Sequence, residues 1–435
     1  MAVQTIPAVH PGADHTIHLA LIGCGGRGTG AIADAMASRD RGPMKLVAMA
    51  DVFADRLEQS YKNLSGTFED HPDLIDVPED RRFLGFDAYK KAIDCLKPGD
   101  IAAIAGPCGF RPQQFRYAVE KGIHVFVEKP FAVDAPTIRE FREIGQAAAQ
   151  KNLKVCAGLM CRHCDARREL LSRIRDGAIG DIVELGCWRM EGSVAYSSPK
   201  RADQTDLEYQ LRVFRHFFWA GGGMFMDLQI HNIDECCWMK DAWPVKVQGM
   251  GGRSDPKSGF DPGFDHHFLE YTFADGTKLF CQERTMSGCW GQFASYANGT
   301  KGSATISTYV HTPAKCAMFP TWERSSLDTA TWAYPQPEPN PYQLEWRHLV
   351  DAIRDDTPMN ECERGADATL TALMGMMAVH SGREITWDEA SNSPMRFCPD
   401  IDAIDYGNPP PVLPDADGYY PRPEVGHNDG VTSWY

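Results

Sequence analysis

From residue 17 to residue 157 the sequence alternates short, continuously apolar runs with amphipathic stretches. Strands that are apolar on both faces are typical of a parallel sheet covered by helices on each side. This alternation therefore predicts an α/β domain with a doubly wound parallel sheet over residues 17–157. The expected strands are His18–Gly23, Met44–Asp51, Ile101–Gly106, Ile123–Lys129 and Leu153–Gly158, and the expected helices are Thr29–Ala37, Arg56–Lys62, Pro112–Lys121 and Ala135–Lys151.

After residue 157 the pattern changes to longer strand-like segments separated by turn signals such as Ala274-Asp275-Gly276. Such spacing favours a mostly antiparallel sheet, and we expect an α+β domain with a large, open sheet over residues 158–391. Residues 1–16 and the proline- and aromatic-rich residues 392–435 are expected to form two arms. The expected strands are Ile182–Met190, Val245–Gly252, His266–Phe273, Lys278–Arg284 and Ser303–Thr308, followed by helices Gln343–Arg354 and Gly365–Arg383.

The composition is that of a globular protein and argues against several classes of partner. Forty-three per cent of the 435 residues are apolar, which is enough to bury more than one core. The net charge of −15, without a basic stripe, argues against a nucleic-acid partner. The start of the chain lacks the pattern of a secretory leader, and no apolar run reaches the roughly 18 residues of a membrane span. We therefore expect a cytoplasmic protein with no membrane partner, in which the cysteines are reduced thiols.

The first expected strand runs into Gly23-Cys24-Gly25-Gly26-Arg27-Gly28, which matches the dinucleotide fingerprint Gly-x-Gly-x-x-Gly. In this motif the glycines allow a tight turn, close approach of the backbone to a diphosphate, and packing of helix on strand. Asp51 ends the next strand, where a carboxylate binds the adenosine ribose hydroxyls and so favours NAD over NADP. An Asp that merely caps the following helix is the structural alternative. The predicted cofactor contacts here are Gly23, Gly25, Gly26, Arg27, Gly28, Asp51 and Arg56.

Two further segments carry groups suited to proton transfer. Glu128-Lys129-Pro130 stands at the carboxyl end of an expected strand, the edge at which open α/β sheets bind ligands. Further on, three glycines precede a helical segment in which Asp227, His231 and Asp234 share one face. A histidine beside carboxylates can have its tautomer and its pKa set for acid–base catalysis. Each segment also has a purely structural interpretation: a solvated lysine at a strand end, and a capped helix with an interior histidine.

Together these segments resemble the glucose–fructose oxidoreductase, inositol dehydrogenase and MocA (Gfo/Idh/MocA) family. The resemblance runs from the glycine turn through AMADVFADR, HVFVEKP and GAIGDIVE to GGGMFMDLQIHNID and the C-terminal ITWDEA. It implies a Rossmann domain followed by an α/β domain whose open sheet commonly makes oligomer contacts, so we expect a homodimer or homotetramer. It also implies hydride transfer between nicotinamide and a secondary alcohol of a small-molecule sugar, sugar derivative or cyclitol.

The resemblance also implies roles for individual residues. Lys129 matches the lysine beside the reacting hydroxyl and the nicotinamide ribose, Asp227 the carboxylate that binds substrate or relays a proton, and His231 the general acid or base. Pro107 and Glu128, together with Lys129, complete the predicted cofactor contacts. For the weaker substrate candidates a surface or packing role fits equally well; these are Arg162, His163, Arg189, Arg215, His216 and Trp219.

One residue differs from the family pattern, and one segment only partly matches a metal-binding motif. Arg111 stands near the place of a histidine in many relatives, which leaves the contacts at the nicotinamide edge in doubt. The segment Cys161-Arg162-His163-Cys164 contains a C-x-x-C pattern but has no second ligand pair at zinc spacing, so no metal site is predicted.

The resemblance leaves a choice of function. The main alternative to a dehydrogenase is a glycoside hydrolase that uses NAD transiently, through oxidation at C3, elimination, hydration and reduction. Relatives of that kind lack the lysine that stands here at position 129, so Lys129 favours the dehydrogenase. A protein that only senses NAD is a third alternative, against which the complete set of Lys129, Asp227 and His231 argues.

Overall fold

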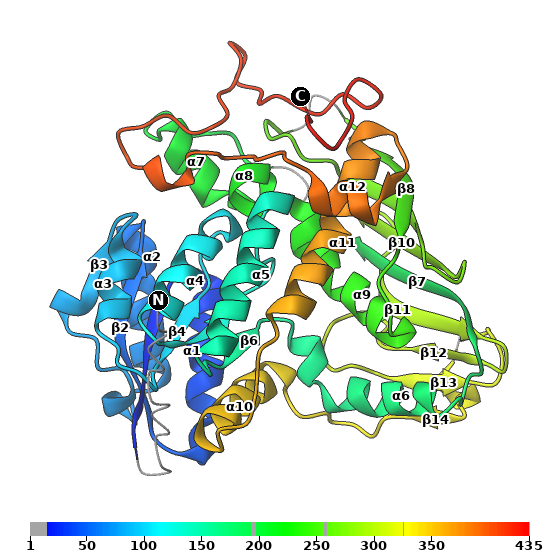
Figure 1. Ribbon diagram of the computed structural model, residues 1–435, viewed down its shortest axis with the longest axis horizontal. Coiled ribbons are helices and arrows are strands. Elements are labelled where there is room, and N and C mark those ends of the chain that lie inside the picture. The colour runs from blue at the N-terminus through cyan, green and yellow to red at the C-terminus, as the bar shows by residue number, and fades with distance from the viewer. Residues whose placement is uncertain (1–14, 193–196, 256–258, 325, 435) are drawn as a thin grey trace.

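The computed structural model describes residues 15–192, 197–255, 259–324 and 326–434, which form two sheets joined by helices (Figure 1). The first sheet has six parallel strands in the order β3-β2-β1-β4-β5-β6, which confirms the doubly wound parallel sheet. Its strands are β1 (Ile17–Ile22), β2 (Met44–Asp51), β3 (Arg82–Leu84), β4 (Ile101–Ile104), β5 (His124–Val127) and β6 (Val155–Ala157). The connecting helices are α1 (Gly26–Ala37), α2 (Ala54–Thr67), α3 (Ala88–Asp94), α4 (Arg111–Glu120) and α5 (Ala135–Gln150).

The second sheet has nine strands within the described residues, in the order β14-β13-β12-β11-β7-β10-β9-β8-β15. Only the β7–β10 pair is parallel among the pairings in this part of the chain, so the sheet is mostly antiparallel, as expected. The strands are β7 (Ile182–Glu191), β8 (Lys246–Gly252), β9 (His266–Thr272), β10 (Lys278–Thr285), β11 (Gln292–Gly299), β12 (Ser303–Thr305), β13 (Ala317–Phe319), β14 (Trp332–Ala333) and β15 (Ile385–Thr386). The helices of this half are α6 (Asp165–Arg175), α7 (Asp206–Arg212), α8 (Phe218–Gly221), α9 (Met224–Lys240), α10 (Pro341–Arg354), α11 (Cys362–Ser381) and α12 (Trp387–Asn392).

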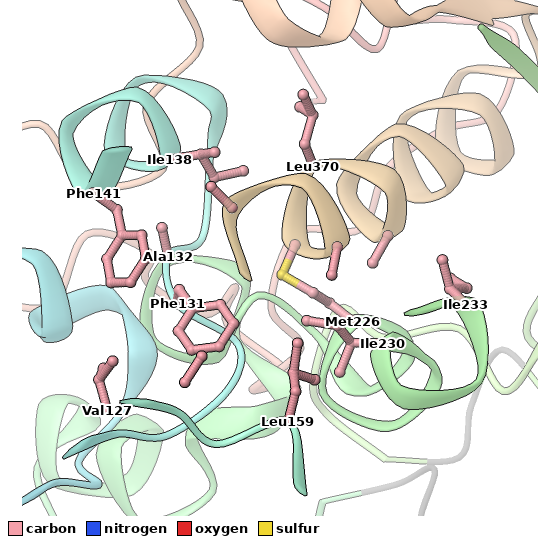
Figure 2. Packing of buried hydrophobic residues seen from close by; sticks show 14 of the residues in the cluster. Val127, Phe131, Ala132, Ile138, Phe141, Leu159, Met226, Ile230, Ile233 and Leu370 are labelled. Carbon is pink, nitrogen blue, oxygen red and sulfur yellow. The ribbon is translucent and has the colours of Figure 1, made fainter. Parts of the chain in front are cut away.

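Helices α5, α9 and α11 meet at the centre of the molecule, between the two sheets. Figure 2 shows Phe131 beside Met226 and Ile230 of α9, with Ile138 of α5 and Leu370 of α11 above them in the view. All five side chains belong to one buried apolar cluster, which extends into both sheets. Because α9 is held rigidly in this cluster, the polar side chains on it have fixed positions.

Helix α10 packs on the first sheet, although in sequence it follows most strands of the second. The Trp346 indole stacks on the Phe126 ring of β5, with 4.3 Å between ring centroids. Leu349, Val350 and Ile353 join the same buried cluster as the residues of β1 and α1. One face of the Rossmann sheet is therefore completed by a helix from the part of the chain, residues 158–391, that the sequence analysis assigned to the second domain. The predicted domain limits remain predictions.

The C-terminal arm packs on its own chain. Trp434 is 1% exposed and makes edge contacts with Phe218 of α8 and His380 of α11. Residues 1–14 of the predicted N-terminal arm lie outside the described residues. No helix among the residues that the structure describes is long and apolar enough to cross a membrane.

Candidate active site

The turn between β1 and α1 is shaped by its glycines. Gly23 has φ +93°, and a Cβ there would lie 2.3 Å from the backbone N of Gly106, while a Cβ at Gly28 would lie 2.0 Å from the Gly23 carbonyl oxygen. By contrast, a Cβ built at Gly25 or Gly26 would meet open space, and no side chain caps α1. Uncapped N–H groups at a helix N-terminus, beside open space, fit the diphosphate of a dinucleotide.

Asp51 ends β2 beside this turn. Its carboxylate accepts N–H bonds from Cys24 (2.6 Å) and Phe53 (2.8 Å). Burial raises the pKa of Asp51, and these two bonds act against the rise. Asp51 lines a cavity beside the glycine turn that is partly open to solvent, and we call it the nucleoside cavity. Other lining residues include Gly23, Gly25, Arg56, Pro107, Phe110, Leu211 and Phe214.

Two later segments border this nucleoside cavity, and we call residues 206–214 together with Tyr406 the cavity cover. Leu211 and Phe214 line the cavity, and the Tyr406 ring contacts the lining residue Phe86. Arg212 forms ion pairs with Asp55 of α2 (3.0 and 3.1 Å), and its carbonyl accepts a bond from Arg56 (3.0 Å). Tyr406 of the C-terminal arm donates to the carbonyl of Val52. The nucleoside cavity is thus built from both halves of the chain.

Arg27 and Glu128 connect the glycine turn to the end of β5. Arg27 Nε lies 2.8 Å from Glu128 Oε1, and the guanidinium stacks over Tyr342 of α10 at 4.8 Å. Although burial alone would lower it, Glu128 raises the pKa of Arg27 above its usual value. Glu345, also on α10, is fully buried, and within the described residues neither of its carboxyl oxygens has a hydrogen-bond partner. Burial and then Glu128 raise the pKa of Glu345 well above its usual value, so the site favours the neutral form of this acid near Arg27 and Glu128.

Lys129 and Asp227 join the end of β5 to the first turn of α9. Lys129 Nζ lies 3.1 Å from Asp227 Oδ1 and 2.6 Å from the Asp227 carbonyl oxygen, and Arg215 Nε lies 3.0 Å from Oδ2. Burial favours the neutral acid, but Lys129 and Arg215 outweigh it and hold the pKa of Asp227 below its usual value. Burial also lowers the pKa of Lys129. The structure therefore brings together the predicted lysine and carboxylate as a buried ion pair beside the expected nicotinamide position.

His231 follows one turn later on α9, and its neighbours are Cys161, named in the sequence only as part of the C-x-x-C pattern, and His311, which the sequence did not single out. His231 Nδ1 lies 3.9 Å from Cys161 Sγ, and its ring meets the edge of His311 with 4.5 Å between centroids. Burial, then His311 and Lys129, lower the pKa of His231 well below its usual value. The imidazole is therefore neutral at neutral pH and can accept a proton.

Of the weaker candidates, Arg189 and Arg215 lie at this centre. Arg189 Nη1 is 3.3 Å from His311 Nε2 and donates to the carbonyl of Leu228 on α9. The other four are held by partners of their own. Arg162 makes two hydrogen bonds to Asp234 (2.8 and 2.7 Å), and His163 Nδ1 is 2.8 Å from His348 Nδ1. His216 Nδ1 is 3.8 Å from the Asp261 carboxylate. The Trp219 side chain is 1% exposed and donates a hydrogen bond to Gln210 at 2.7 Å.

Arg111, the residue that differs from the family pattern, is buried and hydrogen-bonds to backbone carbonyls. Its guanidinium donates to the carbonyls of Gly106 (2.9 Å), Glu128 (2.7 Å) and Pro130. These carbonyls follow β4 and β5, so Arg111 fixes the two loops that flank Lys129.

Within the described residues, two side-chain clusters have atoms close enough to hold a metal ion: Cys156, His163 and Glu361, and Cys161, Glu235 and His311. In both clusters the carboxylate is already bound by an arginine. Glu361 pairs with Arg364 at 2.6 Å, and Glu235 pairs with Arg167 at 2.7 Å. A cation would have to displace these buried ion pairs, so the absence of a metal site remains our prediction.

Comparison with known proteins gives two matching family models. The model described as oxidoreductase family, NAD-binding Rossmann fold, matches residues 17–159, and the GFO/IDH/MocA C-terminal domain matches residues 168–319. Among curated proteins, the rhizopine catabolism protein MocA of Rhizobium meliloti is 23% identical over 166 residues, which are 38% of this chain and 46% of that protein. The matched part of the chain thus spans less than half the length of this relative.

Solved structures share the fold over nearly their whole length. The aldose-aldose oxidoreductase from Caulobacter crescentus, complexed with glycerol, has a TM-score of 0.65 at 18% identity, covering 85% of this chain and 99% of its own. The scyllo-inositol dehydrogenase from Lactobacillus casei, with bound NAD(H) and scyllo-inositol, has a TM-score of 0.62 at 20% identity, covering 86% and 99%. With both domain models matched in order, the chain belongs to the Gfo/Idh/MocA oxidoreductase family.

Proposed function

We propose that this protein is an NAD-dependent dehydrogenase that oxidises a secondary alcohol of a sugar, sugar derivative or cyclitol, or reduces the corresponding ketone. The observation that carries the proposal is the convergence of Lys129, Asp227 and His231 beside the glycine turn. Asp51 supports NAD over NADP, because a buried carboxylate beside the ribose position repels a 2′-phosphate. The named neighbours, an inositol dehydrogenase and an aldose oxidoreductase, support a polyol as the substrate.

The chemistry assigns one task to each side chain. NAD, when bound, supplies the hydride acceptor. Neutral His231 takes the hydroxyl proton as the C–H bond breaks. The Lys129 ammonium stabilises the negative charge that develops on the substrate oxygen. Asp227 orients Lys129 through the 3.1 Å ion pair and keeps it charged against the effect of burial.

The first experiment mixes stoichiometric enzyme and NAD with a panel of sugars, cyclitols and aryl glycosides. Absorbance of reduced nicotinamide and release of aglycone are followed together. We expect reduced cofactor to accumulate without aglycone, and His231→Ala to abolish this signal while NAD still binds. Aglycone release without net reduction would establish the NAD-dependent hydrolase instead. Full turnover by His231→Ala would remove His231 from the role of base.

We also propose that the open sheet mediates self-association. On its outer face Met250 and Phe268, which are 71% and 38% exposed, are neighbours across β8 and β9. Exposed apolar pairs on a sheet face are typical of subunit contacts. Sedimentation should give a dimer or tetramer for the wild type and a monomer for the double variant Met250→Glu/Phe268→Glu. The control is Leu413→Glu, which changes another exposed apolar residue and should leave the oligomer intact. A monomeric wild type would refute this proposal.

The state of the cysteines fits the expected compartment. All fourteen cysteines are free thiols in the structure. Free thiols persist in a reducing compartment, so we propose that the protein acts in the cytoplasm.

A further inference from the structure

The sulfur of Cys161 lies between two buried histidine rings. Its Sγ is 3.9 Å from Nδ1 of His231 and 3.9 Å from Nδ1 of His311. Cys161 is fully buried, on the loop that follows β6, whereas His231 lies on α9 and His311 lies between β12 and β13. Three segments that are distant in sequence thus place one thiol against the same nitrogen of two imidazoles.

Arg189 fixes the proton of His311. An arginine can only donate, so the 3.3 Å contact from Arg189 Nη1 makes His311 Nε2 an acceptor. Burial and then Arg189 lower the pKa of His311 well below its usual value, so the ring carries a single proton. That proton is therefore on Nδ1, the nitrogen that faces Cys161.

The thiol proton of Cys161 has a better acceptor than His231 in the carboxylate of Glu235. Burial raises the pKa of Cys161 well above its usual value, so the group is a thiol and not a thiolate. The Glu235 carboxylate lies within 4.8 Å of Sγ and accepts the thiol proton, whereas the Met160 sulfur, 3.2 Å away, is only a weak acceptor. With the S–H directed toward Glu235, the lone pairs of Cys161 are free to accept N–H bonds from both rings.

We propose that Cys161 is a positioning residue whose sulfur accepts the Nδ1–H of His231 and so leaves the Nε2 lone pair of His231 free for the substrate hydroxyl proton. This inference rests on the proposed role of His231 as base. Within the described residues Cys161 is the only hydrogen-bond partner of His231 Nδ1. Without it, a buried Nδ1–H would have no acceptor, and the ring would shift to the tautomer with the proton on Nε2, which cannot act as a base.

The test compares Cys161→Ala, which removes the acceptor, with Cys161→Ser, which keeps one. Cys161→Ala should lower kcat about 10- to 100-fold, with KM and NAD affinity nearly unchanged. Cys161→Ser should restore most of the lost kcat. Cys156→Ala is the matched control, because Cys156 is equally buried and lies 4.0 Å from His163 Nε2, outside the Lys129–Asp227 centre. It should leave kcat unchanged.

A second measurement does not depend on turnover. In protein labelled with ¹⁵N-histidine, the ring nitrogen shifts of His231, assigned with His231→Ala, report which nitrogen carries the proton. We expect the proton on Nδ1 in the wild type and a shift toward Nε2 in Cys161→Ala. A wild-type proton on Nε2, or equal loss of kcat in the Ala and Ser variants with both folded, would overturn the inference. If the wild type transfers no hydride, the proposed function fails, and the ¹⁵N result still decides the tautomer.

Discussion

The glycine turn and the Lys129–Asp227 pair lie at the same edge of the Rossmann sheet but are built in different ways. The turn is formed by six consecutive residues and offers backbone N–H groups and space. The pair joins residues 98 positions apart, and it depends on the helices that hold α9 in place. A site built from backbone is specified locally, whereas a site built from side chains is specified by the whole fold. The predictions below test this difference.

The largest effect is expected from Lys129→Met. Removing the ammonium withdraws charge stabilisation from the reacting oxygen and leaves Asp227 with Arg215 as its remaining ion-pair partner, so kcat should fall about 10³-fold. Rapid mixing that follows reduced nicotinamide measures this loss. Lys154→Met is the matched control, because Lys154 is 2% exposed and pairs with Asp356 at 2.9 Å outside the site. A comparable fall in both variants would mean that only stability had been tested.

A smaller effect is expected at the nucleotide end. Asp51→Ser should weaken NAD binding about 10- to 100-fold, because the carboxylate no longer binds the ribose. The ratio of NAD affinity to NADP affinity should also fall, because the carboxylate no longer repels the 2′-phosphate of NADP. Titration by intrinsic fluorescence gives both affinities. Asp100→Ser is the control, since Asp100 also is buried and accepts two backbone N–H bonds (2.9 and 2.8 Å) but lies at the start of β4. Unchanged NAD binding in Asp51→Ser would contradict the ribose contact.

Buried histidines link stability to pH. Burial lowers the pKa of His380 well below its ordinary 6.5, and neither ring nitrogen has a partner in the described residues. The unfolded chain therefore binds a proton that the folded chain does not as pH falls below 6.5, and stability falls with it. When the pH is lowered from 7.5 to 5.5, the free energy of unfolding should fall in both proteins, and it should fall by about 1.4 kcal/mol less in His380→Leu than in the wild type. Equal losses, measured by urea unfolding, would show that His380 is protonated in the folded state.

The smallest effect is expected at the cavity cover. Arg212→Ala removes a partly exposed ion pair with Asp55, so NAD should dissociate about 2- to 5-fold faster with little change in kcat. Stopped-flow displacement measures the rate. Arg201→Ala, which removes an exposed pair with Asp203, should not change it. Identical rates in all three proteins would mean that the cover does not limit release.

The two regions also explain what the sequence could and could not predict. The strands β1, β2, β4 and β5, the glycine turn and Asp51 follow from local patterns, and the structure places them at one edge. The face of α9 that carries Asp227 and His231 was predicted from helical spacing. Their roles beside Lys129 were expected from the family resemblance, because no local pattern relates residues so far apart.

The residues that sequence analysis missed are those with no local signal. Strand β11 follows β10 along the chain and lies between β12 and β7 in the sheet; it was not predicted, because its sequence QFASYANG lacks alternation. His311 lies outside any expected element, and Cys161 was considered only as part of a C-x-x-C pattern. Glu345 looks like an ordinary helix residue in sequence, and only packing of α10 on the first sheet buries it.

Helix α10 is synthesised late but packs on the sheet that is synthesised first. Trp346 fills a space against Phe126 in the first sheet, yet the ribosome makes it only after most of the second sheet. The N-terminal half of a nascent chain therefore emerges with an apolar surface that its own residues cannot cover. Final packing of the nucleotide-binding half must await nearly the whole chain, and a truncated fragment of residues 17–157 would expose that surface permanently.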